Sequence, residues 1–158
     1  MKLRLARNKD GKQIINLIRK CYQDYPNCYL DVENDSPELK YVYSYFRKNN
    51  GKFWVYEKND KIIGCMGILP GRERNLEIHR LYINKKYRRR GLAKKLLTIA
   101  ENYALKLKIK KITLWTDTRF KASHKTYKKL DYKKLKKTRK LYDISNTTEY
   151  RFEKKLIS

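Results

Sequence analysis

The segment from Leu76 to Leu107 constrains the fold most, because a strand pattern passes into a helical pattern across one short basic loop. Residues 76–83, LEIHRLYI, alternate along a strand. The alternation gives two predicted faces, Leu76, Ile78, Arg80 and Tyr82 on one and Glu77, His79, Leu81 and Ile83 on the other. From Leu92 to Leu107, apolar residues recur at helical spacing for about four turns. This segment predicts a strand that is followed at once by a helix, as in layered α/β folds.

The rest of the chain continues the mixture of strands and helices. Asp10 and Ser36 are predicted N-caps, and Pro37 takes the first position of its helix. The predicted elements in chain order are strand 2–6, helix 11–22, a helix from 37 to about 48, hairpin strands 53–57 and 61–69, strand 76–83, helix 91–107, strand 110–118, helix 121–130, and strands near 132–137 and 150–156. We therefore expect one mixed α/β domain over residues 1–158, in the order β-α-α-β-β-β-α-β-α-β-β.

Composition and terminal patterns bear on location and metal content. No apolar run approaches the roughly 20 residues of a membrane helix, and the start MKLRLARNKDGK does not resemble a signal peptide. We expect a soluble, cytoplasmic protein with no membrane association. Cys21, Cys28 and Cys65 lack the spacing of zinc or redox motifs, and the two histidines lie far apart in sequence. We expect free thiols and no metal site.

The positive charge is large and uneven. The chain carries 41 Lys/Arg and 16 Asp/Glu, and residues 71–158 hold 28 of the former and 8 of the latter. This half should attract polyanions such as nucleic acid, anionic lipid or a phosphate-rich cofactor. Solvated surface lysines that serve no partner are the alternative explanation, and the sequence leaves both open.

The loop RRRGLA (88–93) has the features of a site for a compact anion. A helix start offers unpaired backbone N–H groups and the positive end of the helix dipole. Gly91 and the small Ala93 allow a ligand to approach the backbone, and arginines add charge-assisted bonds to phosphate oxygens. The sequence contains neither the P-loop motif nor the G-x-G-x-x-G dinucleotide motif. A compact, multiply charged anion such as a pyrophosphate is the predicted ligand.

The same loop resembles the R/Q-x-x-G-x-G/A motif of the Gcn5-related N-acetyltransferase (GNAT) family. LEIHRLYINKKYRRRGLA is similar to the family's fourth strand and cofactor loop, and LWTDTRFKASHKTYKKLDY to its fifth strand and following helix. The resemblance covers nearly the whole chain. It implies a mixed central sheet with splayed strands that hold acetyl-coenzyme A (acetyl-CoA), and direct acetyl transfer to an amine. The resemblance thus implies an acyltransferase that uses acetyl-CoA as cosubstrate and no metal.

The resemblance also implies which residues bind the cofactor. The strand is expected to splay open after 81–83, where backbone groups pair with the pantetheine arm and an N–H holds the acetyl carbonyl. The loop is expected to bind the pyrophosphate. The implied cofactor-binding residues are Leu81, Tyr82, Ile83, Arg88, Arg89, Arg90, Gly91, Leu92, Ala93 and Lys94.

Two residues take catalytic roles by the same resemblance. Tyr127 lies where the family places the general acid that protonates the leaving thiolate. Glu77 lies on the strand where many relatives place a general base. His79 shares the predicted face of Glu77 and could be the base instead, or orient it. The structural alternative for Tyr127 is a core aromatic. For Glu77 it is a solvated carboxylate or a partner for a nearby basic group.

Departures from the family pattern cluster after the fifth strand. Phe120 and Ser123 replace the usual Asn and Ala, which puts one cofactor side-chain contact in doubt. Asp131 and Tyr132 replace Gly-Phe, and Asp131 can adopt the left-handed conformation of the turn. Asp117 and Arg119 are candidate substrate-binding residues, although Asp117 could simply cap the next helix.

One segment without basic residues gives an indication of the acetyl acceptor. Between Lys20 and Lys40 there is no basic residue, while Asp24, Asp31, Glu33, Asp35 and Glu38 alternate with tyrosines that include Tyr29. Carboxylates and aromatic faces suit a cationic amine. The predicted acceptor is a primary amine of a small molecule, amino-acid derivative or peptide, bound by Tyr29, Asp31, Glu33, His79, Asp117 and Arg119. A loop that only balances charge is the alternative.

A second function class stays open at this stage. YKKLKKTRK (132–140) could neutralise several phosphates, which would fit a nucleic-acid- or ribosome-associated binding protein on the same scaffold. The paired lysines also fit a solvent-exposed edge strand that resists aggregation. Nucleic acid is possible but not the expected partner, and the protein is expected to be a monomer or homodimer.

Overall fold

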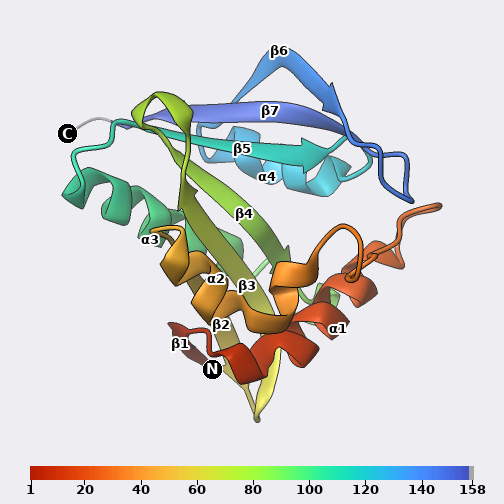
Figure 1. Ribbon diagram of the computed structural model, residues 1–158. Coiled ribbons are helices and arrows are strands. Elements are labelled where there is room, and N and C mark those ends of the chain that lie inside the picture. Colours follow the sequence, from red (N-terminus) through yellow and green to blue (C-terminus); the bar gives the residue numbers. More distant parts are fainter. Residues whose placement is uncertain (157–158) are drawn as a thin grey trace.

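The computed structural model describes residues 1–156, and the expected domain's last two residues lie outside that range. The predicted order of elements is confirmed (Figure 1). The elements are β1 (Lys2–Leu5), α1 (Gly11–Tyr22), α2 (Val42–Lys48), β2 (Lys52–Lys58), β3 (Lys61–Pro70), β4 (Leu76–Ile83), α3 (Leu92–Lys106), β5 (Lys111–Asp117), α4 (Lys121–Lys129), β6 (Lys133–Lys140) and β7 (Thr148–Lys155). A 3-10 turn over Pro37–Tyr41 precedes α2, where the sequence predicts one continuous helix.

All strands belong to one mixed sheet, in the spatial order β1-β2-β3-β4-β5-β7-β6. Neighbours pair antiparallel except β4 and β5, which run parallel. The crossover between this parallel pair is the 76–107 segment's own helix, α3, as expected for a parallel connection. The basic loop therefore lies at the end of β4, next to the only parallel junction among the described strands.

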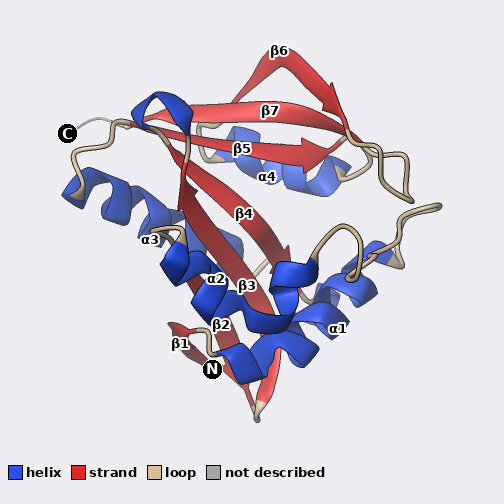
Figure 2. Cartoon of the chain, viewed as in Figure 1, coloured by secondary structure: helices blue, strands red, loops and turns tan. Residues whose placement is uncertain are grey.

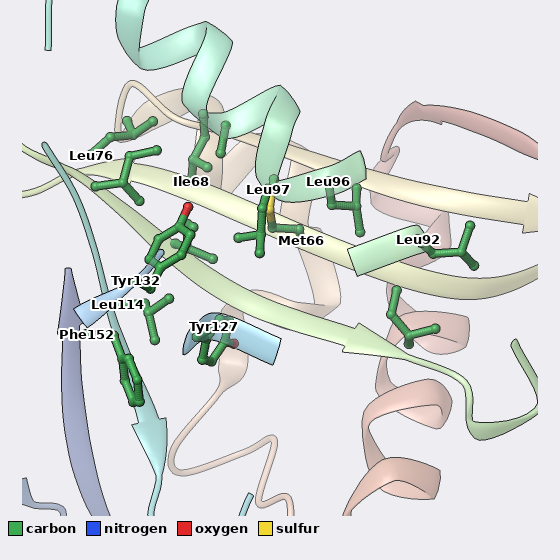
Figure 3. Packing of buried hydrophobic residues seen from close by; sticks show 14 of the residues in the cluster. Met66, Ile68, Leu76, Leu92, Leu96, Leu97, Leu114, Tyr127, Tyr132 and Phe152 are labelled. Atoms are coloured by element: carbon green, nitrogen blue, oxygen red, sulfur yellow. The ribbon is translucent and has the colours of Figure 1, made fainter. Parts of the chain in front are cut away.

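Two helical layers cover the sheet. In Figure 2, α1 and α2 lie in front of the strands, and α3 and α4 lie behind them. Each layer has its own buried apolar cluster, one with α1 and α2 and one with α3 and α4. Figure 3 shows Leu92, Leu96 and Leu97 of α3 packed over Met66 and Ile68 of β3. The predicted apolar stripe of α3 thus faces the sheet.

The strands β4 and β5 diverge along their length (Figure 1). They pair only from Leu76 to Ile78 on β4 and from Ile112 to Leu114 on β5. The predicted splay is present, but it begins after Ile78 and not after 81–83 as the family resemblance implies. Residues 81–83 accordingly lie on the part of β4 that has already separated from β5.

A bulge at Arg80 explains the early separation. Opposite β3, Cys65 pairs with Tyr82 and Gly67 with His79, so β4 contains one extra residue at this point. Arg80 has a positive φ of 55°, which places it in the left-handed region. The bulge reverses the predicted faces beyond it. Arg80 and Tyr82 face the α1 and α2 layer, while Leu81 and Ile83 pack in the opposite cluster.

Neither predicted helix cap is formed, because arginine side chains hydrogen-bond the Asp10 carboxylate and the Ser36 hydroxyl instead. Asp10 makes no capping bond in α1, and its carboxylate accepts two hydrogen bonds from Arg4, at 2.8 and 3.0 Å. The Ser36 hydroxyl accepts a 2.6 Å hydrogen bond from Arg80 Nη2. The Ser36 contact therefore joins two segments 44 residues apart, whereas the Asp10 contact is local.

None of the helices described within residues 1–156 is both long and apolar enough to span a bilayer. The three cysteines are free and buried.

Candidate active site

A cleft opens where β4 and β5 diverge. It encloses about 480 Å³ and is lined by the separated parts of β4 and β5, by α4, and by residues from the α1–α2 and β6–β7 connections. Predicted site residues from both ends of the chain meet here. The lining includes Tyr29, Asp31, Glu77, His79, Leu81, Tyr82, Asp117 and Tyr127.

The basic loop presents an open helix start beside this cleft. Gly91 has a φ of 76° and precedes the first residue of α3. A Cβ at Gly91 would meet nothing within 4 Å, so the space above the loop is free. The first amide of α3 with a backbone partner inside the helix is that of Lys95, which bonds the Gly91 carbonyl at 3.0 Å. The amides before it are available to an anion.

The three arginines of the loop differ in their surroundings. Arg88 points into the protein, where its Nε donates to the Ile83 carbonyl at 3.0 Å. Arg90 stacks on Tyr87, with its guanidinium carbon 5.3 Å from the ring centroid. Arg89 is exposed and adopts a φ of 62°. Backbone amides and Arg89 are therefore better placed for a pyrophosphate than the Arg88 side chain, which supports the loop's shape.

Tyr127 is held in the α4 layer with its hydroxyl group free. Its ring packs against Tyr132 and Phe152, and only 6% of the residue is exposed (Figure 3). The hydroxyl makes no hydrogen bond with any residue of the described part of the chain, and the residue lines the cleft. Burial raises the pKa of Tyr127, so the phenol remains protonated and can act as a proton donor.

Glu77 and His79 lie side by side in the cleft. His79 Nε2 is 3.3 Å from Glu77 Oε1. The other oxygen of Glu77 accepts a 3.0 Å hydrogen bond from Arg151 Nη1 on β7. Burial lowers the pKa of His79 although Glu77 acts in the opposite direction, so the imidazole is neutral at pH 7. A neutral imidazole in this position can accept a proton, and the neighbouring carboxylate then stabilises the positive charge of the imidazolium.

Asp117 and Arg119 bind each other at the rim of the cleft. Arg119 Nε and Nη2 donate to the two oxygens of Asp117, each at 3.0 Å. Asp117 also accepts from the Arg119 amide at 2.9 Å, so it caps the turn before α4. The remaining nitrogen of Arg119 bonds the Asn27 carbonyl at 2.8 Å. Since every nitrogen of this guanidinium has a protein partner, we assign it no contact with a substrate.

The predicted acceptor residues of the α1–α2 connection separate into two groups. Tyr29 and Asp31 line the cleft, together with Asp35. Glu33 does not. Its side chain is 75% exposed and pairs with Lys40 on the outer surface. The structure therefore brings two of the three predicted residues of this segment to the site.

The cleft is acidic in a strongly basic chain. Of 41 Lys/Arg, only Arg80 and Arg139 line it, against seven carboxylates: Asp31, Asp35, Glu38, Glu77, Asp117, Asp143 and Glu149. Arginines pair with Glu38, Glu77, Asp117 and Glu149. Asp31, Asp35 and Asp143 have no cationic partner within the described residues. All three lie at the acceptor end of the cleft, on its two bordering loops.

The sequence pattern did not single out two residues that shape the site, Arg80 and Arg151. Arg80 lines the cleft and binds Ser36 and Glu38, at 2.6 and 3.0 Å. An arginine on the same predicted strand face as Leu76 and Ile78 was a usable signal for it. Arg151 had no such signal, because its partner Glu77 is 74 residues away. Within residues 1–156, the structure shows no group of three or more His, Cys, Asp or Glu that could hold a metal ion.

Comparison with known proteins agrees with this geometry. Residues 12–132 match the profile of the Acetyltransferase (GNAT) family. The chain belongs to this family. Among curated GNAT relatives, "Probable N-acetyltransferase 14" of Xenopus tropicalis is 35% identical over 101 residues, which is 62% of this chain and 48% of that protein. The chain thus spans about half the length of that relative.

Solved acetyltransferase structures share the fold over nearly all of the described chain. A GNAT acetyltransferase from Staphylococcus aureus Mu50 superposes with a TM-score of 0.84 at 19% identity, and the match covers 99% of each chain. The PaiA N-acetyltransferase of Thermoplasma acidophilum, solved in complex with coenzyme A, gives a TM-score of 0.76 at 20% identity and covers 98% of each chain.

Proposed function

We propose that this protein is an N-acetyltransferase that transfers acetyl directly from acetyl-CoA to a primary amine. The observation that carries the proposal is the open start of α3 at Gly91, next to a cleft between diverging parallel strands. A pyrophosphate fits the free amides of this helix start, and the pantetheine arm fits the gap between β4 and β5. Family membership supports the same reaction class.

The loop and the separated half of β4 would hold the cosubstrate. The amides of Leu92, Ala93 and Lys94 precede the first hydrogen-bonded amide of α3 and would bind the phosphates, and Arg89 would add charge. Along β4, residues 81–83 are free of β5. Apart from the Ile83 carbonyl, which Arg88 binds, they can offer backbone groups to an extended arm, as a neighbouring strand would. The amine nitrogen then attacks the thioester carbonyl, forming a C–N bond while the C–S bond breaks.

The reaction needs a group that removes a proton from the amine and a group that gives a proton to the thiolate, and we assign these roles to residues on opposite sides of the cleft. A cationic amine must lose a proton before it can attack. We assign this step to the Glu77–His79 pair, with His79 as acceptor of the proton and Glu77, held by Arg151, stabilising the imidazolium. The leaving thiolate takes a proton from the Tyr127 hydroxyl, which has no protein partner within the described residues. The second proton that the nitrogen loses as the amide forms returns to the Tyr127 oxygen, and the His79 imidazolium releases its proton to solvent.

The acceptor is proposed to be a small amine that arrives as a cation. The three carboxylates without cationic partners, Asp31, Asp35 and Asp143, lie where such a substrate would enter. Coulombic attraction between them and an ammonium group favours a cation over an anion at this end.

The test is calorimetric titration with acetyl-CoA of the wild type, Gly91→Asp and Gly91→Ala. Both variants adopt the same positive φ at a cost of roughly 1–2 kcal/mol, but only Asp adds a charge that repels phosphate. We expect micromolar binding in the wild type, at least a hundredfold weaker binding in Gly91→Asp, and a much smaller loss in Gly91→Ala. Equal binding by the wild type and Gly91→Asp would refute the cofactor site. Release of free thiol with a pool of small amines then tests transfer.

A further inference from the structure

Arg119 joins three segments of the chain at the acceptor end of the cleft. Its guanidinium is oriented by Asp117 on β5, as described above. From there Nη1 donates to the carbonyls of Pro26 and Asn27, at 3.4 and 2.8 Å. Nη2 donates to the Ser145 carbonyl at 3.2 Å and to the Thr147 hydroxyl at 3.3 Å. One side chain thus connects the end of β5 to the α1–α2 connection and to the β6–β7 connection.

A second contact joins the same two loops directly. The Tyr29 amide donates to Ser145 Oγ at 2.7 Å, and Ser145 Oγ donates to the Tyr29 carbonyl at 3.0 Å. The β6–β7 loop is itself braced, because Asp143 accepts hydrogen bonds from the Thr147 amide and hydroxyl, at 2.8 and 2.7 Å. We call Arg119, Asp117 and Ser145, with the bonds they make, the clasp.

The clasp crosses the mouth of the cleft. Figure 1 shows the α1–α2 connection and the β6–β7 connection approaching each other on the right, beyond the open ends of β4 and β5. Tyr29 and Asp31 line the cleft from one loop, and Asp143 and Ser145 line it from the other. The two loops therefore form a roof over the position where the acceptor would enter.

We propose that the clasp makes the acceptor site a closed pocket, so that the enzyme acetylates small cationic amines and excludes amines carried on a peptide or folded protein. This inference rests on the proposed acetyl transfer and adds the class of acceptor. A cleft of about 480 Å³ must hold the end of the thioester arm and the acceptor together. That volume is in the usual range for one small ligand, and hydrogen bonds between Tyr29 and Ser145 join the two loops at the acceptor end.

The charge inside the roof agrees with this acceptor. Asp31 and Asp143 lie on opposite loops, and neither has a cationic partner in the described part of the chain. An ammonium group beneath the clasp would face a carboxylate from each side. A lysine on a protein surface would bring neighbouring backbone that the tied loops cannot admit.

Cys28 offers a direct probe of whether the clasp is closed. It lies on the α1–α2 connection, lines the cleft and is 7% exposed. Burial raises its pKa to about 11, although Arg119 acts in the opposite direction. The thiol is therefore both shielded and protonated in the clasped state. Opening the roof should expose Cys28, while Cys21 and Cys65 stay buried.

The experiment compares the wild type with Arg119→Gln, Ser145→Ala and the double variant Asp117→Asn/Arg119→Gln, which avoids leaving a buried Asp117 carboxylate unpaired. Arg47→Gln, an exposed arginine on α2, is the matched control. An aromatic disulfide reagent measures thiol reactivity. We expect Cys28 to react at least tenfold faster in the clasp variants than in the wild type and Arg47→Gln. Cys28→Ser, added to each variant, should remove that phase.

Selectivity is measured in the same proteins by free-thiol release with 1,5-diaminopentane and with a twelve-residue peptide containing one lysine. We expect kcat/KM of the wild type to favour the diamine at least a hundredfold, and that ratio to fall at least tenfold in Arg119→Gln. Equal use of the peptide by the wild type, no turnover of the diamine despite acetyl-CoA binding, or unchanged ratios and Cys28 reactivity in all clasp variants would overturn the inference. If the wild type did not bind acetyl-CoA at all, that result would instead refute the proposed function itself.

Discussion

Arg151 Nη1 lies 3.0 Å from Glu77 Oε2, and His79 Nε2 lies 3.3 Å from the other oxygen of the same carboxylate. Glu77 is thus held between a permanent cation from β7 and a titratable ring on its own strand. The guanidinium of Arg151 also stacks on Trp115, with its carbon 4.8 Å from the ring centroid, which fixes the arrangement. An ion-paired carboxylate is a weak base, so the imidazole is the better proton acceptor of the two.

The pH dependence of turnover should separate His79 from Glu77. Because burial lowers the pKa of His79 below its ordinary value of 6.5, the ring is neutral at pH 7 and gains a proton only below that value. We expect kcat/KM to be level near pH 7 and to fall on the acid side of pH 6.5. His79→Gln should lower kcat by about a hundredfold and abolish this acid limb. The charges of Glu38, Arg80 and Arg139 also act on the pKa of His79. Added salt should therefore shift the acid limb of the pH profile modestly.

The companion variant is Glu77→Gln, which keeps the shape of the side chain. It should lower kcat less than His79→Gln and retain an acid limb, moved to lower pH because the carboxylate that favours imidazolium is gone. Acetyl-CoA binding by calorimetry should be unchanged in both. An acid limb that survives in His79→Gln and disappears in Glu77→Gln would place the base on Glu77.

Tyr127→Phe tests the proposed general acid with little change in packing. The ring contacts with Tyr132 and Phe152 remain, and the hydroxyl has no partner to lose within the described residues. We expect kcat to fall about 10²- to 10³-fold, the range for a lost proton donor, while the melting temperature and the acetyl-CoA Kd stay the same. A variant with full turnover would leave Tyr127 as a core aromatic only.

The sequence predicted the features that depend on neighbouring residues. The start of α3 just after Gly91 and the apolar stripe of α3 follow from local pattern, and both are confirmed. The bulge at Arg80 could not be found in this way, because it depends on how β3 pairs with β4. Nor could the loss of the Ser36 cap, since its hydroxyl binds an arginine 44 residues away. Arg119 was placed at the site, but its loop partners are up to 93 residues away.

Asp10 should contribute to stability in a pH-dependent way. Burial would raise its pKa, but hydrogen bonds from the Arg4 side chain and the Arg7 amide outweigh burial, and the pKa lies below its ordinary 3.8. A lowered pKa means that the stabilisation is present above about pH 4 and is lost as pH falls through the folded-state value. Asp10→Asn should cost about 1.5–3 kcal/mol at pH 7. Urea unfolding should show the gap to wild type closing toward pH 3, and a constant gap would contradict the linkage.

Arg80 should affect the stability of the fold in two opposite ways. Its side-chain hydrogen bonds stabilise the folded protein, and its backbone conformation destabilises it. Its φ of 55° is unfavourable for every residue with a Cβ, by about 1–2 kcal/mol. Arg80→Ala and Arg80→Gly both remove the bonds to Ser36 and Glu38, but only glycine relieves the backbone. Arg80→Gly should therefore be about 1 kcal/mol more stable than Arg80→Ala in urea unfolding, and both should be less stable than the wild type. If alanine proved as stable as glycine, the bulge would not survive the loss of the arginine, since a normal strand has no such preference for glycine. In that case both variants should also lose turnover, because the separation of β4 from β5 depends on the bulge.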